Sequence, residues 1–231
     1  MSAPSVIVFD VNETLSDMAP LAGRFEAIGA PRHLAPLWFS HLLRDGFALT
    51  AAGDRAGFAE IGTAMLHEVL HGLPLTTDRE QGVRYVMEGF GQLLVHPDVP
   101  PGVRALRARG FRLVTLSNGA AEVARGLLDR SGITPEFEQL LSVEDAAAWK
   151  PARSAYEYAA GQCGVQPEEM MLVAVHPWDI HGAARAGLGT GWINRDGGRW
   201  PGYFHAPEVT AGSMEELAEA LRGAGDHPHR P

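Results

Sequence analysis

Hydrophobic residues follow two different patterns in the first part of the chain. Residues 5–9 are apolar almost throughout and end at Asp10, which is typical of a short buried strand. Over residues 17–92 the apolar side chains instead recur at helical spacing, as at Trp38 and Leu42. The pattern therefore predicts one strand followed by an all-helical segment of three to five helices.

From residue 93 onward, apolar strands alternate with helical segments. Strands are predicted over 111–116, 139–142, 170–175 and 191–194, and helices over 103–109, 121–131, 151–163, 180–186 and 214–221. Apolar strands separated by helices are typical of a parallel sheet covered on both faces. We therefore expect an α/β fold, with a disordered tail over residues 223–231.

Polar side chains follow two of the predicted strands at their carboxyl ends. Asp10 ends the first strand, and Asn12 and Thr14 come directly after it. Ser117 and Asn118 end the next strand along the chain. Because ligands of open α/β sheets bind outside the carboxyl ends of the strands, these residues are candidates for a site.

A second group of polar residues is expected at the same edge. His176, Trp178 and Asp179 follow the strand at 170–175, and Lys150 precedes a proline expected to begin a helix. Lys150 is the one lysine among 19 basic residues, which suggests a position that needs a compact ammonium.

Each of these residues also has a purely structural interpretation. A carboxylate or hydroxyl can cap a turn or a helix, Asp179 can complement a helix dipole, and His176 can be a loop histidine without a task. Together, however, two carboxylates, a hydroxyl, an amide and an ammonium at successive strand ends form a set that can do chemistry.

The motifs resemble those of the haloacid dehalogenase superfamily, in the same order and over nearly the whole chain. The matching segments are F-D-V-N-E-T-L at 9–15, L-S-N-G at 116–119, W-K-P at 149–151 with Tyr156, and H-P-W-D-I-H-G-A at 176–183. The resemblance implies a Rossmann-like core of residues 1–16 and 93–231 and a helical cap domain of residues 17–92. Within the superfamily, the chain is most similar to the type II L-2-haloacid dehalogenases.

The superfamily also contains Mg²⁺-dependent phosphatases, whose requirements are poorly met. Such enzymes use an acid two residues after the nucleophile, but position 12 is Asn, whose amide cannot protonate a leaving alcohol. Val175 stands where a further acid is expected, and Glu13 is expected to point away. Because Mg²⁺ prefers several oxygen ligands, Asp10 and Asp179 alone make a poor site, and we expect neither metal nor organic cofactor.

The resemblance instead implies hydrolytic dehalogenation of a small 2-haloalkanoic acid. Asp10 is expected to displace the halide and form an aspartyl ester, which water hydrolyses with Asp179 as general base. Lys150, with Ser117, is expected to hold the carboxylates. Asn118 is expected to donate a hydrogen bond to the halide or the substrate.

Further residues are expected to bind substrate. Thr14 is one of them. Tyr156 is expected to form a hydrogen bond near Lys150. Trp178 is expected to orient Asp179 and to form a wall of the pocket, and plain core packing is the alternative for Trp178.

Three positions of the halide site depart from the family. Asn12 stands where these dehalogenases commonly have Tyr, His176 where they have Asn, and Leu49 where the cap supplies an Arg. Arg44, on the same predicted helix, is interpreted as a surface residue. The halide site is thus altered on three sides, and a different small substrate is an alternative.

The composition of the chain limits the kinds of partner that we expect. The net charge is −9 without a basic block, so nucleic acid is not expected, and no run of 18 apolar residues predicts a membrane span. With no signal peptide and one cysteine, Cys163, we expect a soluble cytoplasmic protein. A homodimer is a family-level expectation.

The functional alternatives are a Mg²⁺-dependent phosphatase acting on a small phosphate ester, and a catalytically idle member that binds a small acid or a protein.

Overall fold

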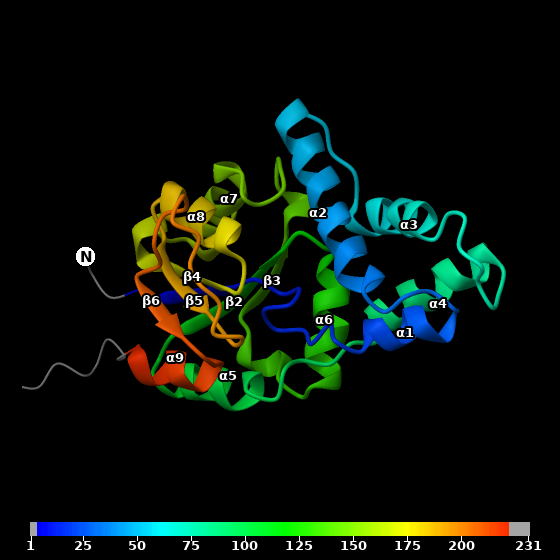
Figure 1. The fold of residues 1–231 in the computed structure, drawn as a ribbon. Coiled ribbons are helices and arrows are strands. Elements are labelled where there is room, and N and C mark those ends of the chain that lie inside the picture. The colour runs from blue at the N-terminus through cyan, green and yellow to red at the C-terminus, as the bar shows by residue number, and fades with distance from the viewer. Residues whose placement is uncertain (1–3, 222–231) are drawn as a thin grey trace, which may run out of the picture.

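The computed structural model describes residues 4–221, and the tail predicted to be disordered lies outside them. In this part of the chain, six strands form one sheet in the order β3-β2-β1-β4-β5-β6, with every neighbouring pair parallel (Figure 1). The strands are β1 (Val6–Phe9), β2 (Arg112–Ser117), β3 (Gln139–Ser142), β4 (Met170–Ala174), β5 (Gly189–Ile193) and β6 (Val209–Ala211). The apolar strand β1 is buried at the centre, between β2 and β4, so its last residues lie beside the ends of both.

Helices cover both faces of the sheet. They are α5 (Val99–Ala108), α6 (Ala121–Arg130), α7 (Arg153–Cys163), α8 (Pro177–Ala186) and α9 (Met214–Ala220), with short 3₁₀ turns at Thr134–Glu136, Val143–Asp145 and Pro167–Glu169. Helices α5 and α9 pack together on one face, and α7 and α8 on the other (Figure 1). The predicted α/β fold is confirmed.

Four further helices lie between β1 and β2 in the sequence. They are α1 (Leu21–Ala27), α2 (Leu34–Ala52), α3 (Phe58–Val69) and α4 (Arg79–Gly91), and they form a separate group beside the sheet (Figure 1). Trp38 lies at their centre: it contacts Phe25 and Phe90, and its Nε1 donates to the carbonyl oxygen of Gly62 at 2.8 Å. Trp38 thus joins all four inserted helices, whose buried side chains belong to the same hydrophobic cluster as those of the sheet.

The chain segments that lead into and out of these helices lie side by side. Ser16 and Val95 form an antiparallel bridge, close to the predicted domain limits at residues 17 and 92. The limits themselves stay a prediction. No helix within residues 4–221 is long and apolar enough to cross a membrane.

Several element boundaries differ from those predicted. Helix α5 begins at Val99 rather than at 103, and α8 at Pro177 rather than at 180, because proline is tolerated in a first helical turn. Helix α7 begins at Arg153, so Pro151 precedes it rather than starting it. Strand β6 was not predicted, since it has three residues and only one is buried.

Helix α2 packs tightly against the core at Gly46. A Cβ atom built at this position would overlap the ring of Trp149, which is stacked on Phe58 at a centroid distance of 6.0 Å. Trp149 directly precedes Lys150, so this contact joins the inserted helices to the segment that carries the lysine.

We predict that Gly46→Ala lowers the free energy of unfolding by about 1–3 kcal/mol, because the methyl group must displace the Trp149 ring. Urea denaturation measures this as a lower midpoint. Gly23→Ala in α1 is the matched control: nothing lies within 4 Å of its added Cβ, and alanine favours the helix by up to about 1 kcal/mol. A Gly46→Ala protein as stable as the control would contradict the close contact.

Candidate active site

Asp10 is the first residue after β1, at the centre of the sheet edge. Its backbone N–H donates to the carbonyl oxygen of Val173 at 3.0 Å, which continues the pairing with β4. The residue is only 4% exposed. Since the ends of β2 and β4 flank β1, side chains from both neighbouring loops can reach its carboxylate.

The Lys150 ammonium joins two carboxylates. Its Nζ donates to Asp10 Oδ1 at 2.9 Å and to Asp179 Oδ2 at 2.7 Å, and the lysine is fully buried. A compact ammonium fits between two oxygen atoms, whereas a planar guanidinium is larger. The expectation that Lys150 holds both carboxylates is therefore met by its contacts.

The backbone of Lys150 is fixed in turn by Asn118. The Lys150 N–H donates to Asn118 Oδ1 at 3.0 Å, and Asn118 Nδ2 donates to the Lys150 carbonyl oxygen at 3.3 Å. This paired contact was not predicted from the sequence. The predicted hydrogen bond from Asn118 to a halide stays a prediction.

Burial and charge act differently on the two carboxylates. Burial alone raises the pKa of Asp10, but Lys150, His176 and Thr14 lower it well below its ordinary value. Burial raises the pKa of Asp179, and the attraction of Lys150 does not cancel this effect. Such a difference between the two pKa values suits an ionised nucleophile beside a carboxylate that can accept a proton.

Tyr156 binds the second carboxylate, as expected for a residue near Lys150. Its hydroxyl donates to Asp179 Oδ1 at 2.6 Å, and both side chains are fully buried. Burial, with the nearby Asp179 carboxylate, raises the pKa of Tyr156 well above its ordinary value, so the phenol remains a donor. Asp179 is thus held at both oxygens, by Tyr156 and by Lys150.

His176 lies between two carboxylates. Its Nδ1 lies 3.1 Å from Asp10 Oδ2 and its Nε2 lies 2.7 Å from Glu13 Oε2. Because an ionised carboxylate only accepts hydrogen bonds, both ring nitrogens must carry protons. Burial lowers the pKa of His176, but the two carboxylates outweigh this and raise it to about 9.

His176 therefore has two carboxylate partners, and whether it has a catalytic task stays a prediction. The Glu13 side chain is directed at His176 and does not contact Asp10. Glu13 has a φ of 62°, in the left-handed region that only a few non-glycine residues adopt. The chain turns at this residue instead of continuing as an extended segment, and the carboxylate reaches His176.

Thr14 supplies a further donor to Asp10. Its Oγ1 donates to Asp10 Oδ2 at 2.7 Å and accepts from the N–H of Val175 at 3.0 Å. The second contact orients the hydroxyl. Because a lone pair of Oγ1 faces the Val175 N–H, the hydroxyl proton is directed at Asp10. Thr14 therefore contacts the carboxylate directly, a contact not predicted from the sequence.

Ser117 differs from expectation. Its Oγ accepts from the N–H of Gly119 at 2.9 Å, and within the described residues it forms no hydrogen bond with Asp10 or Asp179. The short side chain is used to close the turn that follows β2. The expectation that Ser117 helps Lys150 to hold the carboxylates is wrong for this state of the protein.

Trp178 packs beside His176. Their rings stack at a centroid distance of 5.0 Å, and Phe47 of α2 meets the indole edge-on at 4.9 Å. Lys150 Nζ lies 6.0 Å from the centroid of the indole ring. The residue thus lies at the site and also joins it to α2, while its predicted effect on the orientation of Asp179 stays a prediction.

The other positions of the expected halide site have fewer contacts with the residues around Asp10. Asn12 is buried at 8% exposure, and its side chain forms no hydrogen bond within the described residues. Leu49 is half-buried on α2, and its contact with substrate stays a prediction. Arg44 is exposed and pairs with Asp45, as interpreted from the sequence.

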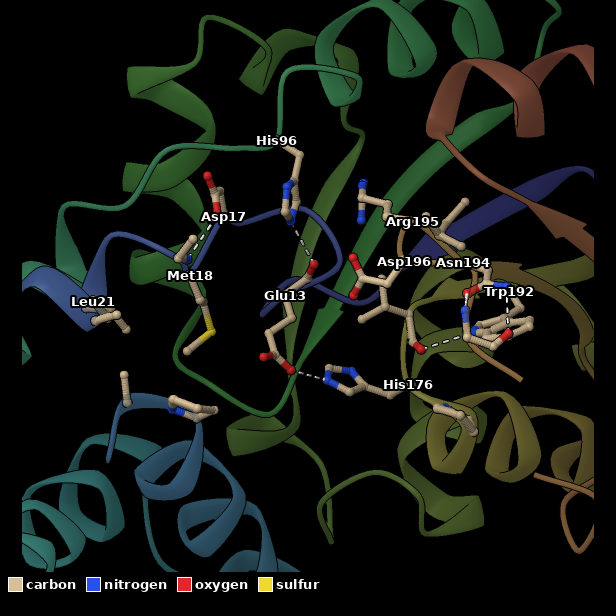
Figure 2. A pocket seen from close by; sticks show the side chains of 18 residues that line it. Glu13, Asp17, Met18, Leu21, His96, His176, Trp192, Asn194, Arg195 and Asp196 are labelled. Atoms are coloured by element: carbon tan, nitrogen blue, oxygen red, sulfur yellow. Dashed lines mark hydrogen bonds and ion pairs between the residues drawn. The ribbon is translucent and has the colours of Figure 1, made fainter. Parts of the chain in front are cut away.

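A cavity of about 580 Å³ adjoins the His176–Glu13 pair. Its wall includes Asn194, Arg195 and Asp196 after β5, and residues of α1 and α2 on the opposite side. Figure 2 shows the hydrogen bond between the Glu13 carboxylate and the His176 ring, which both line this cavity. The lining includes His176 and Glu13 but not Asp10.

The residues do not fit a Mg²⁺ ion well. The carboxylates of Asp10 and Asp179 already share the Lys150 ammonium, and the third nearby carboxylate, Glu13, pairs with His176. Within residues 4–221, no three acidic, histidine or cysteine side chains are grouped so as to hold a metal ion. A magnesium ion would have to compete with two cations that belong to the chain.

A family model described as a haloacid dehalogenase-like hydrolase matches residues 4–187, which include each of the residues that surround Asp10. The chain belongs to this family. The resemblance seen in the sequence motifs is therefore confirmed, and the protein is a haloacid dehalogenase-like hydrolase.

Similar proteins support the same assignment. Haloacetate dehalogenase H-2 of Moraxella sp. (strain B) is 30% identical, over 96% of this chain and 99% of its own. (S)-2-Haloacid dehalogenase 1 of Pseudomonas sp. (strain CBS-3) is 30% identical, over 93% and 95%. A crystal structure of a dehalogenase superposes with a TM-score of 0.89 at 28% identity, covering 96% of this chain and 98% of that one. The similarity to haloacid dehalogenase-like hydrolases thus includes the inserted helices.

Glu13 is the functional candidate that sequence reasoning missed. The available signal was an acid within the first motif together with a histidine at the start of the fourth motif, two positions that meet at neighbouring strand ends. What the sequence did not reveal is the left-handed backbone of Glu13, which decides the direction of its side chain.

We predict that His176 stays protonated at pH 7.5 and titrates near pH 9, because two carboxylates bind its ring. NMR of the imidazole signals, assigned through their loss in His176→Asn, measures the midpoint. Since the pKa is raised from 6.5 to about 9, the stability this pairing contributes is complete below pH 6.5 and is lost as the pH rises through 9. A midpoint at or below 6.5 would contradict the assigned ion pairs.

Proposed function

We propose that the protein hydrolyses the carbon–halide bond of a small 2-haloalkanoic acid through an ester on Asp10. The observation that carries this proposal is the pair of buried carboxylates around Lys150, one with a lowered pKa and one with a raised pKa. The names of the similar proteins, haloacetate dehalogenase and (S)-2-haloacid dehalogenase, support the substrate class.

In the first half of the reaction, an Asp10 oxygen attacks the carbon that bears the halogen. The halide departs with the bonding electron pair and needs no proton, so an acid at position 12 is dispensable and Asn12 is acceptable. Lys150 keeps Asp10 ionised at neutral pH, as a nucleophile requires.

In the second half, water attacks the carboxyl carbon of the Asp10 ester and Asp179 accepts its proton. The raised pKa of Asp179 favours this transfer, and Tyr156 and Lys150 fix the orientation of the carboxylate. The bond from the carboxyl carbon to the ester oxygen then breaks. The product is a 2-hydroxy acid that carries an oxygen atom from Asp10.

Metal independence is part of the proposal. Lys150 and His176 already supply positive charge beside Asp10, where a phosphatase would hold Mg²⁺, and Asn12 cannot protonate a leaving alcohol. A catalytically idle protein is also less consistent with the site, because burying two carboxylates and an ammonium carries a large desolvation cost that apolar residues avoid.

The helices α1–α4 are proposed to act as a cap domain, residues 17–92, over the sheet edge. Two aromatic contacts support this: Phe39 of α2 lies 6.3 Å from the ring of His176, and Phe47 lies 4.9 Å from Trp178. The cap would exclude bulk water and limit the site to small acids.

We predict that the protein releases halide from 2-chloropropionate or a haloacetate, at a rate that EDTA does not change. Asp10→Asn should lower the rate at least about 10⁴-fold, because the amide is no nucleophile. Ion chromatography of halide measures both effects. Asp54→Asn, an exposed loop substitution, serves as the matched control and should keep the wild-type rate.

Failure to release halide from any member of a haloacid panel would contradict the proposal. Turnover of p-nitrophenyl phosphate that disappears with EDTA would instead indicate a phosphatase.

A further inference from the structure

The two oxygen atoms of Asp10 have different surroundings. Among the residues that the structure describes, Oδ1 accepts one hydrogen bond, from Lys150 Nζ. Oδ2 accepts two, from Thr14 Oγ1 at 2.7 Å and from His176 Nδ1 at 3.1 Å. Both oxygen atoms have one charged donor, but an attack through Oδ2 would weaken two donor contacts and an attack through Oδ1 only one. Oδ1 is therefore the better nucleophile, and Oδ2 becomes the carbonyl oxygen of the ester.

We infer that Thr14 and the His176 imidazolium form an oxyanion hole for hydrolysis of the Asp10 ester, with Glu13 as the positioning residue that keeps His176 charged and oriented. This inference rests on the proposed function and deepens it, because it assigns His176 and Glu13 to one of the two half-reactions.

The electron and proton movements of the hydrolytic step explain this assignment. When water adds to the carboxyl carbon, the carbonyl π pair moves to Oδ2, and one water proton passes to Asp179. The negative charge on Oδ2 faces two donors that are already in place, which is the arrangement that stabilises such a transition state. When the oxyanion collapses, the bond to Oδ1 breaks beside Lys150, and the leaving alkoxide takes the proton held by Asp179.

In the alkylation step, in which the ester forms, the charge on the oxygen atoms of Asp10 changes in the opposite direction. Charge on the Asp10 carboxylate decreases as the ester forms, so the hydrogen bonds to Oδ2 weaken in that step. His176 therefore gives no advantage to halide displacement, and its benefit lies in hydrolysis. Loss of His176 should separate the two half-reactions rather than slow both.

Glu13 acts through His176 and does not contact Asp10. Its Oε2 lies 2.7 Å from His176 Nε2, on the side of the ring that faces the cavity, and the side chain is 39% exposed. The carboxylate holds the second ring proton, which fixes the imidazolium charge, and it fixes the ring rotation that aims Nδ1 at Asp10. A neutral amide at this position would keep the size of the side chain but not the charge.

The test follows both half-reactions in one experiment. Enzyme is mixed with excess 2-chloropropionate and quenched at successive times; halide is counted, and the mass of the peptide that contains Asp10 is measured. We expect His176→Leu, which removes both ring donors, to show a halide burst of about one per active site, a mass increase on that peptide, and hydrolysis slowed about 10²–10³-fold.

Glu13→Gln should show the same pattern with a smaller loss, and it covers the case in which His176→Leu does not fold. Glu13→Asp, which keeps the charge, should restore hydrolysis toward the wild-type rate. The matched control is Glu219→Gln, an exposed change on α9, which should accumulate no ester.

The outcomes separate this inference from the proposed function. If the wild type releases halide, but His176→Leu and Glu13→Gln slow the burst and the steady state equally and no ester accumulates, the oxyanion hole is overturned while the dehalogenase proposal stands. If the wild type releases no halide from any haloacid, the proposed function fails and this inference fails with it.

Discussion

The ammonium of Lys150, shared by two carboxylates that are almost inaccessible to water, is the interaction on which the rest of the site depends. Removing such charges from water costs several kcal/mol per ion unless their hydrogen bonds are satisfied. The surrounding contacts satisfy them: Asn118 holds the lysine backbone, Tyr156 binds Asp179, and Thr14 binds Asp10. These residues lie far apart in the sequence, and the parallel sheet brings them to one edge because β1 is its central strand.

The two carboxylates of the site also differ in their contacts. Lys150 and Tyr156 surround the carboxylate with the raised pKa, whereas His176 and Thr14 face one oxygen of the ionised carboxylate. The proposed reaction needs this asymmetry, because Asp10 must attack a carbon first and receive water later. The helices over the sheet edge complete the arrangement, since α2 packs against Trp149 and Trp178, which lie beside the lysine and the histidine.

The sequence predicted the α/β fold, the inserted helices and the meeting of Asp10, Lys150 and Asp179, because strand ends in a parallel sheet converge and because the chain has a single lysine. It did not predict contacts that depend on loop conformation. Ser117 binds its own turn, Asn118 holds the backbone of Lys150, and Glu13, in a left-handed backbone conformation, reaches His176. Helix starts were displaced where prolines enter a first turn. The homodimer and the cytoplasmic location stay predictions.

Mass spectrometry after multiple turnovers of a 2-haloacid in H₂¹⁸O tests the central claim, that Asp10 forms an ester and gives its oxygen to the product, most directly. The expected result is ¹⁸O in the peptide that contains Asp10, with none in the peptide that contains Asp179, and unlabelled hydroxy acid from the first turnover. Turnover with ¹⁸O in the product and none at Asp10 would show that water attacks the substrate directly, and it would contradict the role assigned to Asp10.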